Sequence, residues 1–276
     1  MNMLKNKLVY LHTGCKWSEP WDEAFRFGLN KLGCEYIECD LATVVVDRPG
    51  VFIGRLNESC LQYKEIYEDK SRQFEWCWPE PLAMWLYDDK IRQVNWLKHQ
   101  SISVPKQMVV NRPEDVSMLP CVQKLANGSA SRNVKRVHLI DDVEYPSVHQ
   151  EFCDGNDSDY RITIIGDYAM GSRRMNRPGD FRASGSNNCI ILDKLPEEPV
   201  KLSAQLCREN AFTTMAFDWI KKNNEWVMIE MSYAYPIYSI TRDCKFYFNT
   251  RTMERYDATP DPVAMLLRHV FQVPLS

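Results

Sequence analysis

The residues with the clearest chemical capacity are arginines gathered in the middle of the chain. They stand beside the apolar run Ile162 to Ile165, which is typical of a buried strand. A guanidinium is a planar fork that donates two parallel hydrogen bonds, so arginine clusters of this kind usually bind phosphate or carboxylate. The sequence therefore indicates a site for an anionic ligand, and its candidate residues are Arg161, Arg173, Arg174, Arg177 and Arg182.

Two carboxylates and a hydroxyl form a second candidate group. Glu230 and Ser232 lie in one apolar strand and share a face, because side chains alternate along a strand. Asp218, in the preceding strand, joins that face only if the hairpin loop has an odd length, so we predict a three- or five-residue loop centred on Asn224. Oxygen ligands suit Mg²⁺, with Mn²⁺ as the alternative ion. We therefore predict a metal site of Asp218, Glu230 and Ser232.

A lysine followed by a loop of small residues forms a third candidate group. Lys124 ends a short strand that begins at Cys121, and the loop after it contains Ser129 and Ser131. Backbone NH groups and hydroxyls in such a loop can approach a triphosphate closely. The alternative is a flexible turn with no ligand.

The order of the central motifs resembles that of the ATP-grasp superfamily, and within it the branch of the ribosomal-protein glutamate ligase. The resemblance covers roughly residues 88–232. It rests on Gln150-Glu151-Phe152, then Asp159-Tyr160-Arg161, then Arg173-Arg174 followed by Gly179-Asp180-Phe181-Arg182. It implies an α/β (α+β) chain with the ATP-grasp fold, in which a small N-terminal α/β lobe precedes two α+β lobes that clamp ATP.

The elements that must position these residues follow from the same sequence. We predict an N-terminal lobe over residues 1–80 and an ATP-grasp unit over 81–276, divided into a first nucleotide lobe (81–150) and a second lobe with the metal site (151–276). Strands are expected over Lys7–His12, Glu35–Glu38 and Val51–Arg55, with a helix from Ser18 that ends at Gly33. Further helices are expected over Lys90–Gln100 and Asp261–Phe271.

The resemblance also implies roles for single residues. Lys90 and Lys124 would contact the nucleotide phosphates, and Gln150, Glu151 and Phe152 would form the hinge that holds adenine. Asp159 would bind ribose, while Phe152 and Ile229 would give the purine apolar walls; a core role for both is the alternative. For the reaction itself, the candidates are catalytic Arg182 and Arg173 and substrate-binding Arg55, Arg174 and Ser184.

Arg55 is a candidate for substrate binding because of its position in the predicted N-terminal sheet, independently of the resemblance. It closes the predicted strand that begins at Val51, and ligands of open α/β sheets bind at the carboxyl ends of the strands. It could meet an acidic substrate, or it could be a surface arginine that ends a strand.

The chain departs from the family pattern at two places of consequence. Ser232 stands where the family has asparagine, and a hydroxyl is a poorer metal ligand than an amide carbonyl. The bulky segment from Tyr233 to Tyr238 replaces a small turn that ends in glycine, so we expect a rebuilt acceptor pocket.

The composition limits which kinds of ligand and partner are expected. A net charge of −3 argues against a nucleic-acid partner, and the ten cysteines contain no C-x-x-C pair, so zinc is not expected. Neither a signal peptide nor a membrane span is expected, and we predict a cytoplasmic protein with reduced thiols. A homodimer is left open.

Together these features predict an enzyme that uses ATP and Mg²⁺. We expect a carboxylate-amine ligase that forms an acyl phosphate and then an amide, with a small-molecule or glycan carboxylate and an amine as substrates, in surface-polysaccharide or peptide modification. A small-molecule kinase would use the same nucleotide site but would need a general base beside its acceptor. A catalytically silent nucleotide-binding module is disfavoured, because both lysines, Asp218 and Glu230 are present.

Overall fold

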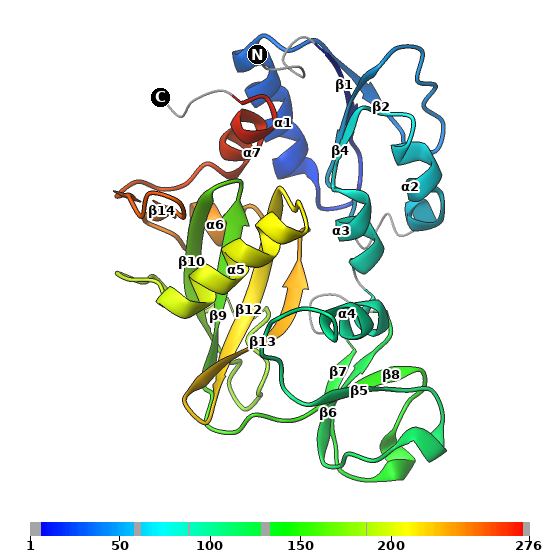
Figure 1. Ribbon diagram of the computed structural model, residues 1–276, viewed down its shortest axis with the longest axis vertical. Coiled ribbons are helices and arrows are strands. Elements are labelled where there is room, and N and C mark those ends of the chain that lie inside the picture. The colour runs from blue at the N-terminus through cyan, green and yellow to red at the C-terminus, as the bar shows by residue number, and fades with distance from the viewer. Residues whose placement is uncertain (1–6, 58–61, 88, 128–132, 186, 273–276) are drawn as a thin grey trace.

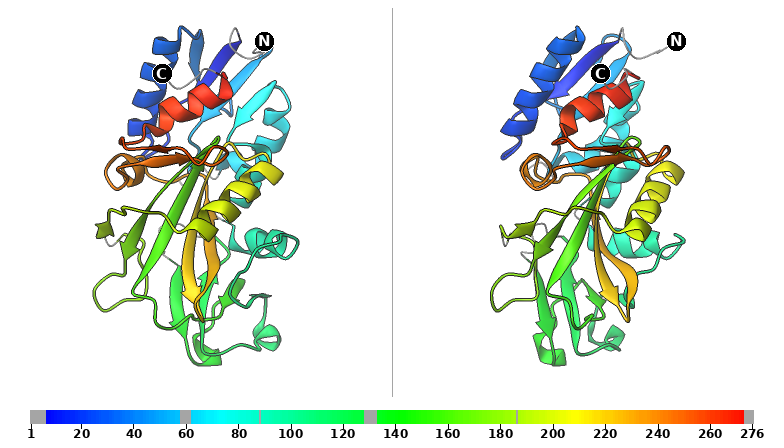
Figure 2. Two further views of the ribbon diagram at one scale, coloured as in Figure 1. Left: turned by 60° about the vertical axis from the view of Figure 1, so that its left-hand side comes forward. Right: turned by 90° about the vertical axis from the view of Figure 1, so that its left-hand side faces the viewer.

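The computed structural model describes residues 7–57, 62–87, 89–127, 133–185 and 187–272, and within these ranges the chain forms three sheets. The three sheets follow one another along the long axis of the molecule, with the N-terminal sheet at one end and a small sheet at the other (Figure 1). The two further views show the same order (Figure 2). The ligand-binding candidates lie where the sheets meet.

The N-terminal sheet is parallel, in the order β2 (Tyr36–Cys39), β1 (Leu8–His12), β3 (Gly50–Gly54) and β4 (Trp76–Trp78). β1 and β3 are buried at every position, as expected for strands covered on both faces. The predicted strands are confirmed to within a residue or two. Helices α1 (Glu19–Leu32) and α2 (Lys64–Ser71) accompany this sheet. α1 ends where predicted, because Gly33 adopts the left-handed backbone (φ 67°) that favours glycine.

The small sheet is antiparallel, in the order β5 (Gln107–Val110), β8 (Ser147–Gln150), β6 (Cys121–Leu125) and β7 (Val134–Val137). Helices α3 (Pro81–Leu86) and α4 (Lys90–Leu97) lead into it, with short 3-10 turns at Pro113–Asp115 and Ile140–Asp142. α4 begins at Asp89, whose carboxylate accepts a hydrogen bond from the Arg92 NH at 2.9 Å. The helix predicted at Lys90 is therefore confirmed, although it ends at Leu97.

The large sheet provides most of the site. Its strands run in the order β13 (Glu225–Ser232), β12 (Thr214–Lys222), β9 (Ser158–Ile165), β10 (Tyr168–Met175), β14 (Tyr247–Asn249) and β15 (Arg255–Tyr256), with β11 (Cys189–Ile190) beside β10. All of these pairs are antiparallel. Helix α5 (Glu197–Glu209) lies across one face of the sheet, as Figure 1 shows, and α6 (Tyr238–Thr241) follows β13.

The hairpin between β12 and β13 differs from the prediction. Its loop has only two residues, Asn223 and Asn224, both with positive φ (51° and 68°), as a type I′ turn requires. The predicted three- or five-residue loop was therefore wrong. The register shifts inside the hairpin instead: Asp218 pairs with Glu230, while Trp219 pairs with Met228. Ile229 is thus the extra residue of a β-bulge, and the bulge brings Asp218 to the face of Glu230.

The C-terminal helix α7 (Pro262–Val270) returns to the N-terminal sheet and lies beside α1 (Figures 1 and 2). The two helices approach closely at Gly28, where an added Cβ would lie 2.6 Å from Leu267 Cδ1. The predicted closing helix is confirmed, and Asp261 caps it through a bond from the Ala264 NH at 2.9 Å.

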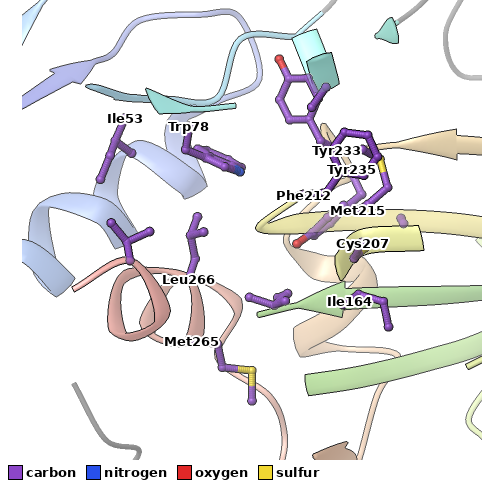
Figure 3. Close-up of a cluster of buried hydrophobic side chains, with 14 of the residues drawn as sticks. Ile53, Trp78, Ile164, Cys207, Phe212, Met215, Tyr233, Tyr235, Met265 and Leu266 are labelled. Atoms are coloured by element: carbon purple, nitrogen blue, oxygen red, sulfur yellow. The ribbon is translucent and has the colours of Figure 1, made fainter. Parts of the chain in front are cut away.

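One hydrophobic core continues from the N-terminal sheet into the large sheet. Figure 3 shows Ile53 and Trp78 of the first sheet near Leu266 of α7, with Ile164 and Met215 of the large sheet beyond them. Beneath the small sheet lies a separate cluster of Cys121, Val137 and Val143. The boundaries at residues 80 and 150 stay a prediction.

The remaining expectations concern a membrane span and the state of the cysteines. Within the described ranges no helix combines the length and the apolar character needed to cross a bilayer. The thiols described as free include Cys34, Cys77 and Cys207, whereas Cys15 is disulfide-bonded. The expectation of reduced thiols is therefore wrong at Cys15.

Candidate active site

Two adjoining pockets lie at the junction of the three sheets. The larger pocket, of about 250 Å³, is lined by Arg55 of the N-terminal sheet, Lys90 of α4 and residues of the large sheet. The smaller pocket, of about 100 Å³, lies between Lys124 of the small sheet and Ile229 of the large sheet. The two pockets share one wall, which consists of Arg174, Ala183, Ser184, Asp218 and Glu230.

Cross-strand pairing explains how the charged part of this wall is built. Glu230 of β13 is opposite Asp218 of β12, and Asp218 is opposite Arg161 of β9. Asp159, two residues before Arg161 in β9, is opposite Arg174 of β10. Since directly opposed residues share a face, these five side chains project from the same side of the sheet.

The guanidiniums and carboxylates of this row are tightly paired. Arg161 binds Asp218 through two parallel bonds of 2.8 Å each. Arg174 binds Asp159 in the same way, at 2.7 and 2.6 Å, and also reaches Asp218 Oδ2 at 2.7 Å. Burial alone would raise the pKa of Asp218, but the charges of Arg161 and Arg174 outweigh it and hold that pKa well below its usual range. Asp218 is therefore a fixed anion.

Two lysines of the small-sheet side reach across to the large sheet. Lys90 Nζ lies 2.5 Å from Glu230 Oε1, and Lys124 Nζ donates to the Ile229 carbonyl at 2.9 Å. Burial lowers the pKa of Lys124 to about 8, against the opposing effect of Glu230. Burial raises the pKa of Glu230, but Lys90 and Lys124 more than offset it and keep the pKa below its ordinary value. The bulge residue Ile229 thus supplies the carbonyl that holds Lys124.

The predicted hinge follows β8 and lines the smaller pocket. The Glu151 NH donates to the Lys106 carbonyl at 2.8 Å, and its carboxylate pairs with Lys222 at 2.7 Å. The Phe152 ring meets Phe181 edge-on, with centroids 5.7 Å apart, and carries the Arg136 guanidinium 3.9 Å above its centroid. This gives the pocket a flat aromatic wall.

Most of the other predicted nucleotide residues line the same pocket. Gln150, Asp159 and Ile229 all lie on its wall, although the side chain of Gln150 donates to Gln107 at 3.1 Å and Asp159 is paired with Arg174. Ser129 and Ser131 lie outside the described residues.

The predicted arginines separate into different environments. Arg182 lines the smaller pocket and is bound by Asp180, with Arg182 Nε 2.8 Å from Asp180 Oδ2. Arg173 does not line either pocket, because it alternates with Arg174 along β10 and points to the opposite face. There it binds Ser158 Oγ at 2.7 Å and Asp157 at 2.8 Å.

The larger pocket also contains residues that the sequence did not single out. Tyr87, Arg242 and Asp243 line it, and Arg242 forms two bonds of 2.6 and 2.9 Å to Asp243. An adjacent Arg-Asp pair is common on protein surfaces and gave no signal by itself. The bulky segment after Ser232, flagged as unusual, does line this pocket through Ala234, Tyr235 and Pro236.

The carboxylates of Asp218 and Glu230 fit Mg²⁺ only together with the phosphates of a nucleotide. Among the described residues no group of three or more His, Cys, Asp or Glu side chains could hold a metal ion. Asp218 and Glu230 offer two anionic carboxylates on one face, and Mg²⁺ is commonly held by one or two carboxylates plus substrate phosphates. Ser232 lines the larger pocket, and its Oγ accepts a bond from the Ala234 NH at 3.2 Å.

The fold is similar to that of solved ATP-grasp proteins. The structure of the ATP-grasp ligase PsnB complexed with a minimal precursor matches with a TM-score of 0.64 and 13% identity, over 97% of this chain and 99% of that chain. A RimK domain ATP-grasp protein from Sphaerobacter thermophilus matches with a TM-score of 0.66 and 12% identity, over 95% and 98% of the two chains. N5-carboxyaminoimidazole ribonucleotide synthetase from Thermotoga maritima matches with a TM-score of 0.61 and 12% identity, over 98% and 77%.

Sequence comparison adds no closer relation. No family model matches this chain, and no curated protein matches it. The structural likeness extends over nearly the whole chain and includes RimK-like proteins, as the central motifs indicated. The chain therefore has the ATP-grasp fold.

Proposed function

We propose that this protein is an ATP-dependent carboxylate-amine ligase that forms an amide through an acyl phosphate. The observation that carries the proposal is the wall shared by the two pockets. A nucleotide in the smaller pocket would direct its terminal phosphate toward this wall, and an acceptor in the larger pocket would meet it from the other side. Phosphoryl transfer needs this adjacency, because catalysis consists mainly of positioning and charge stabilisation.

Each part of the nucleotide site has a function in this proposal. The aromatic wall at Phe152 and the apolar side chain of Ile229 would bind the purine, while Lys90 and Lys124 would bind phosphate oxygens. Mg²⁺, held by Asp218 and Glu230, would neutralise charge on the phosphates. Both lysines are already anchored on the large-sheet side, so binding a nucleotide between the sheets would need little rearrangement of these side chains.

The acceptor side supplies positive charge at the shared wall. Arg174 is buried there and keeps its orientation through Asp159 and Asp218, so it is preorganised to stabilise the carboxylate and the acyl phosphate. Arg182, on the nucleotide side of the same wall, would stabilise the transferring phosphoryl group. Arg173 points away and is not part of the proposed mechanism.

Among the described residues of the larger pocket, no carboxylate is suited to act as a general base, and this favours a ligase over a kinase. A kinase would need a carboxylate that accepts the proton of an alcohol. Asp218 and Glu230 both have pKa values below the ordinary range and are ion-paired, which makes them weak bases. The remaining described carboxylate on the larger pocket, Asp243, is bound bidentately by Arg242. A carboxylate acceptor needs no such base, because it is already ionised.

Isotope transfer tests the proposal. An acceptor carboxylate labelled with ¹⁸O should give labelled inorganic phosphate, because the amine displaces phosphate from the acyl carbon and one acceptor oxygen leaves with it. Hydroxylamine should intercept the acyl phosphate as a hydroxamate. ADP formed together with a stable phosphorylated product, without free phosphate, would instead establish a kinase. The identity of the acid and the amine, whether small molecule, glycan or peptide, would come from a panel screened by ADP release.

A further inference from the structure

Arg55 differs from every other arginine on the two pockets. Each of the others is paired with a carboxylate: Arg161 with Asp218, Arg174 with Asp159 and Asp218, Arg182 with Asp180, and Arg242 with Asp243. Arg55 has no such partner among the described Asp and Glu residues. Its side chain is nevertheless buried, with an exposed fraction of 6% for the residue. A buried guanidinium without an anion is costly, and no described residue supplies one, so a bound anion would stabilise Arg55.

The protein holds this guanidinium in place without neutralising it. Arg55 Nη2 donates to the Ala234 carbonyl at 2.9 Å, and Nη1 is 3.5 Å from the Trp17 carbonyl. Both acceptors are neutral. Arg55 Nε is buried and has no hydrogen-bond partner. The side chain is therefore oriented in advance, and one N–H on each of Nη1 and Nη2 is left for a ligand.

The position of Arg55 indicates which ligand this is. It follows β3 at the carboxyl edge of the N-terminal sheet, and it lines the larger pocket but not the smaller one. The described lining of the larger pocket carries five cationic side chains and three carboxylates, and of the cations Arg55 is the one without an acidic partner. An anion at Arg55 would therefore belong to the acceptor and not to the nucleotide.

We propose that the acceptor is a dicarboxylate: one carboxylate is activated at the shared wall, and a second binds Arg55. The inference rests on the proposed function, because it treats the bound acid as the acceptor of the ligase. Binding of the acid can be measured without turnover. A single guanidinium with unused N–H groups on Nη1 and Nη2 suits a planar carboxylate, which can accept a bond from each. A phosphate usually gathers several cations or backbone NH groups, whereas Arg55 is the one described cation of this pocket without an acidic partner. The volume of about 250 Å³ limits the bound part of the acceptor to a small molecule or the end of a larger one.

The test is a comparison of acids that differ by one carboxylate. Calorimetric titration of the full chain with ADP and Mg²⁺ present would use succinate, glutarate and adipate against butyrate, valerate and hexanoate. At least one dicarboxylate should bind the wild type roughly tenfold more tightly than its monocarboxylate match. Arg55→Gln should remove that difference, while ADP affinity stays unchanged. The control Arg26→Gln, on α1, should keep the difference, since Arg26 lines neither pocket and pairs with Glu38 on the surface.

Other results would overturn the proposal. Equal binding of the two series by wild type, no binding of any dicarboxylate, or tighter binding of phosphorylated acids such as phosphoglycolate would exclude a second carboxylate at Arg55. If Arg55 only fastens the segment at Ala234, Arg55→Gln and Arg55→Lys should weaken both series equally and lower the melting temperature. Arg55→Lys keeps the positive charge and replaces Arg55→Gln as the test variant if the latter does not fold. If the proposal holds, Arg55→Lys should retain part of the preference for dicarboxylates over monocarboxylates. Lack of ADP release with every acid and amine would refute the proposed ligase yet leave the binding result standing.

Discussion

Asp218 and Glu230 face each other across β12 and β13 because Ile229 is an extra residue between them and the hairpin turn. Without the bulge, the two-residue turn would pair Asp218 with Ile229 and direct the two carboxylates to opposite faces. The same bulge residue offers its carbonyl to Lys124 at 2.9 Å. One irregularity in the sheet therefore places both carboxylates of the proposed metal site and one lysine of the proposed phosphate site.

ATP with Mg²⁺ should stabilise the folded protein. A ligand at a hundred times its dissociation constant adds about 2.7 kcal/mol to the free energy of unfolding, which corresponds to a rise of several degrees in melting temperature. GTP should give a smaller rise, because the smaller pocket is expected to be shaped for adenine. Differential scanning fluorimetry with and without Mg²⁺ measures this. A folded protein whose melting temperature responds to no nucleotide would contradict the nucleotide site.

Glu230→Gln should abolish most of the turnover while the chain stays folded. The substitution keeps the size of the side chain but removes one of two carboxylates proposed for Mg²⁺, and we expect a loss of about a hundredfold or more in kcat. Circular dichroism would verify the fold. Glu225→Gln is the matched control, since Glu225 lies exposed at the start of the same strand. Wild-type turnover by Glu230→Gln would remove the metal assignment.

Asp218→Asn should destabilise the fold as well as inactivate the protein. It leaves the half-buried Arg161 and part of the buried Arg174 without their anion, and breaking a buried ion pair in this way costs about 3–5 kcal/mol of unfolding free energy. Urea denaturation gives the value. Asp157→Asn, which affects the exposed pair with Arg173, should change stability by no more than about 1 kcal/mol. Similar effects of the two substitutions would argue against a tightly coupled buried network.

Nucleotide affinity should fall as pH rises above the pKa of Lys124, about 8. The lysine must be protonated to bind phosphate, and in the free protein it loses its proton above that pH; the dissociation constant of ADP should then rise by about tenfold per pH unit. Lys124→Arg keeps the charge throughout and should flatten this dependence. Titration calorimetry between about pH 7 and about pH 9.5 compares the two proteins. An equally flat profile for wild type would refute the role of Lys124.

The same lowered pKa has a consequence for stability. Burial penalises the charged form of Lys124 in the folded state, so the penalty is present while the lysine is protonated in both states. It is relieved as pH rises from about 8 toward the ordinary lysine value of 10.5. The contribution of this group to the free energy of unfolding should therefore increase with pH across that window. Lys124→Met, compared with wild type by urea denaturation, isolates this contribution.

Local signals in the sequence determined much of the architecture. Gly33 ends α1 because glycine accepts the left-handed backbone, Asp89 and Asp261 begin helices because their carboxylates cap free NH groups, and apolar runs predicted strands such as β9. These signals act over a few residues, so they can be read without knowing the fold. The order of the central motifs was sufficient to indicate the ATP-grasp fold.

Only the tertiary structure decided how the site is assembled. The bulge at Ile229 depends on pairing between whole strands; a longer loop was predicted instead, on the assumption of a regular hairpin in which Asp218 shares a face with Glu230. Arg173 and Arg174 alternate along β10, and only the packing of the sheet decides which of the two faces the pockets. That Arg55 is buried without an acidic partner among the described residues emerges only when the N-terminal sheet packs against the segment after β13. Local sequence does not show which distant residues an arginine will meet. The sequence by itself therefore determined which chemical groups the protein carries, and long-range packing determined which of them meet.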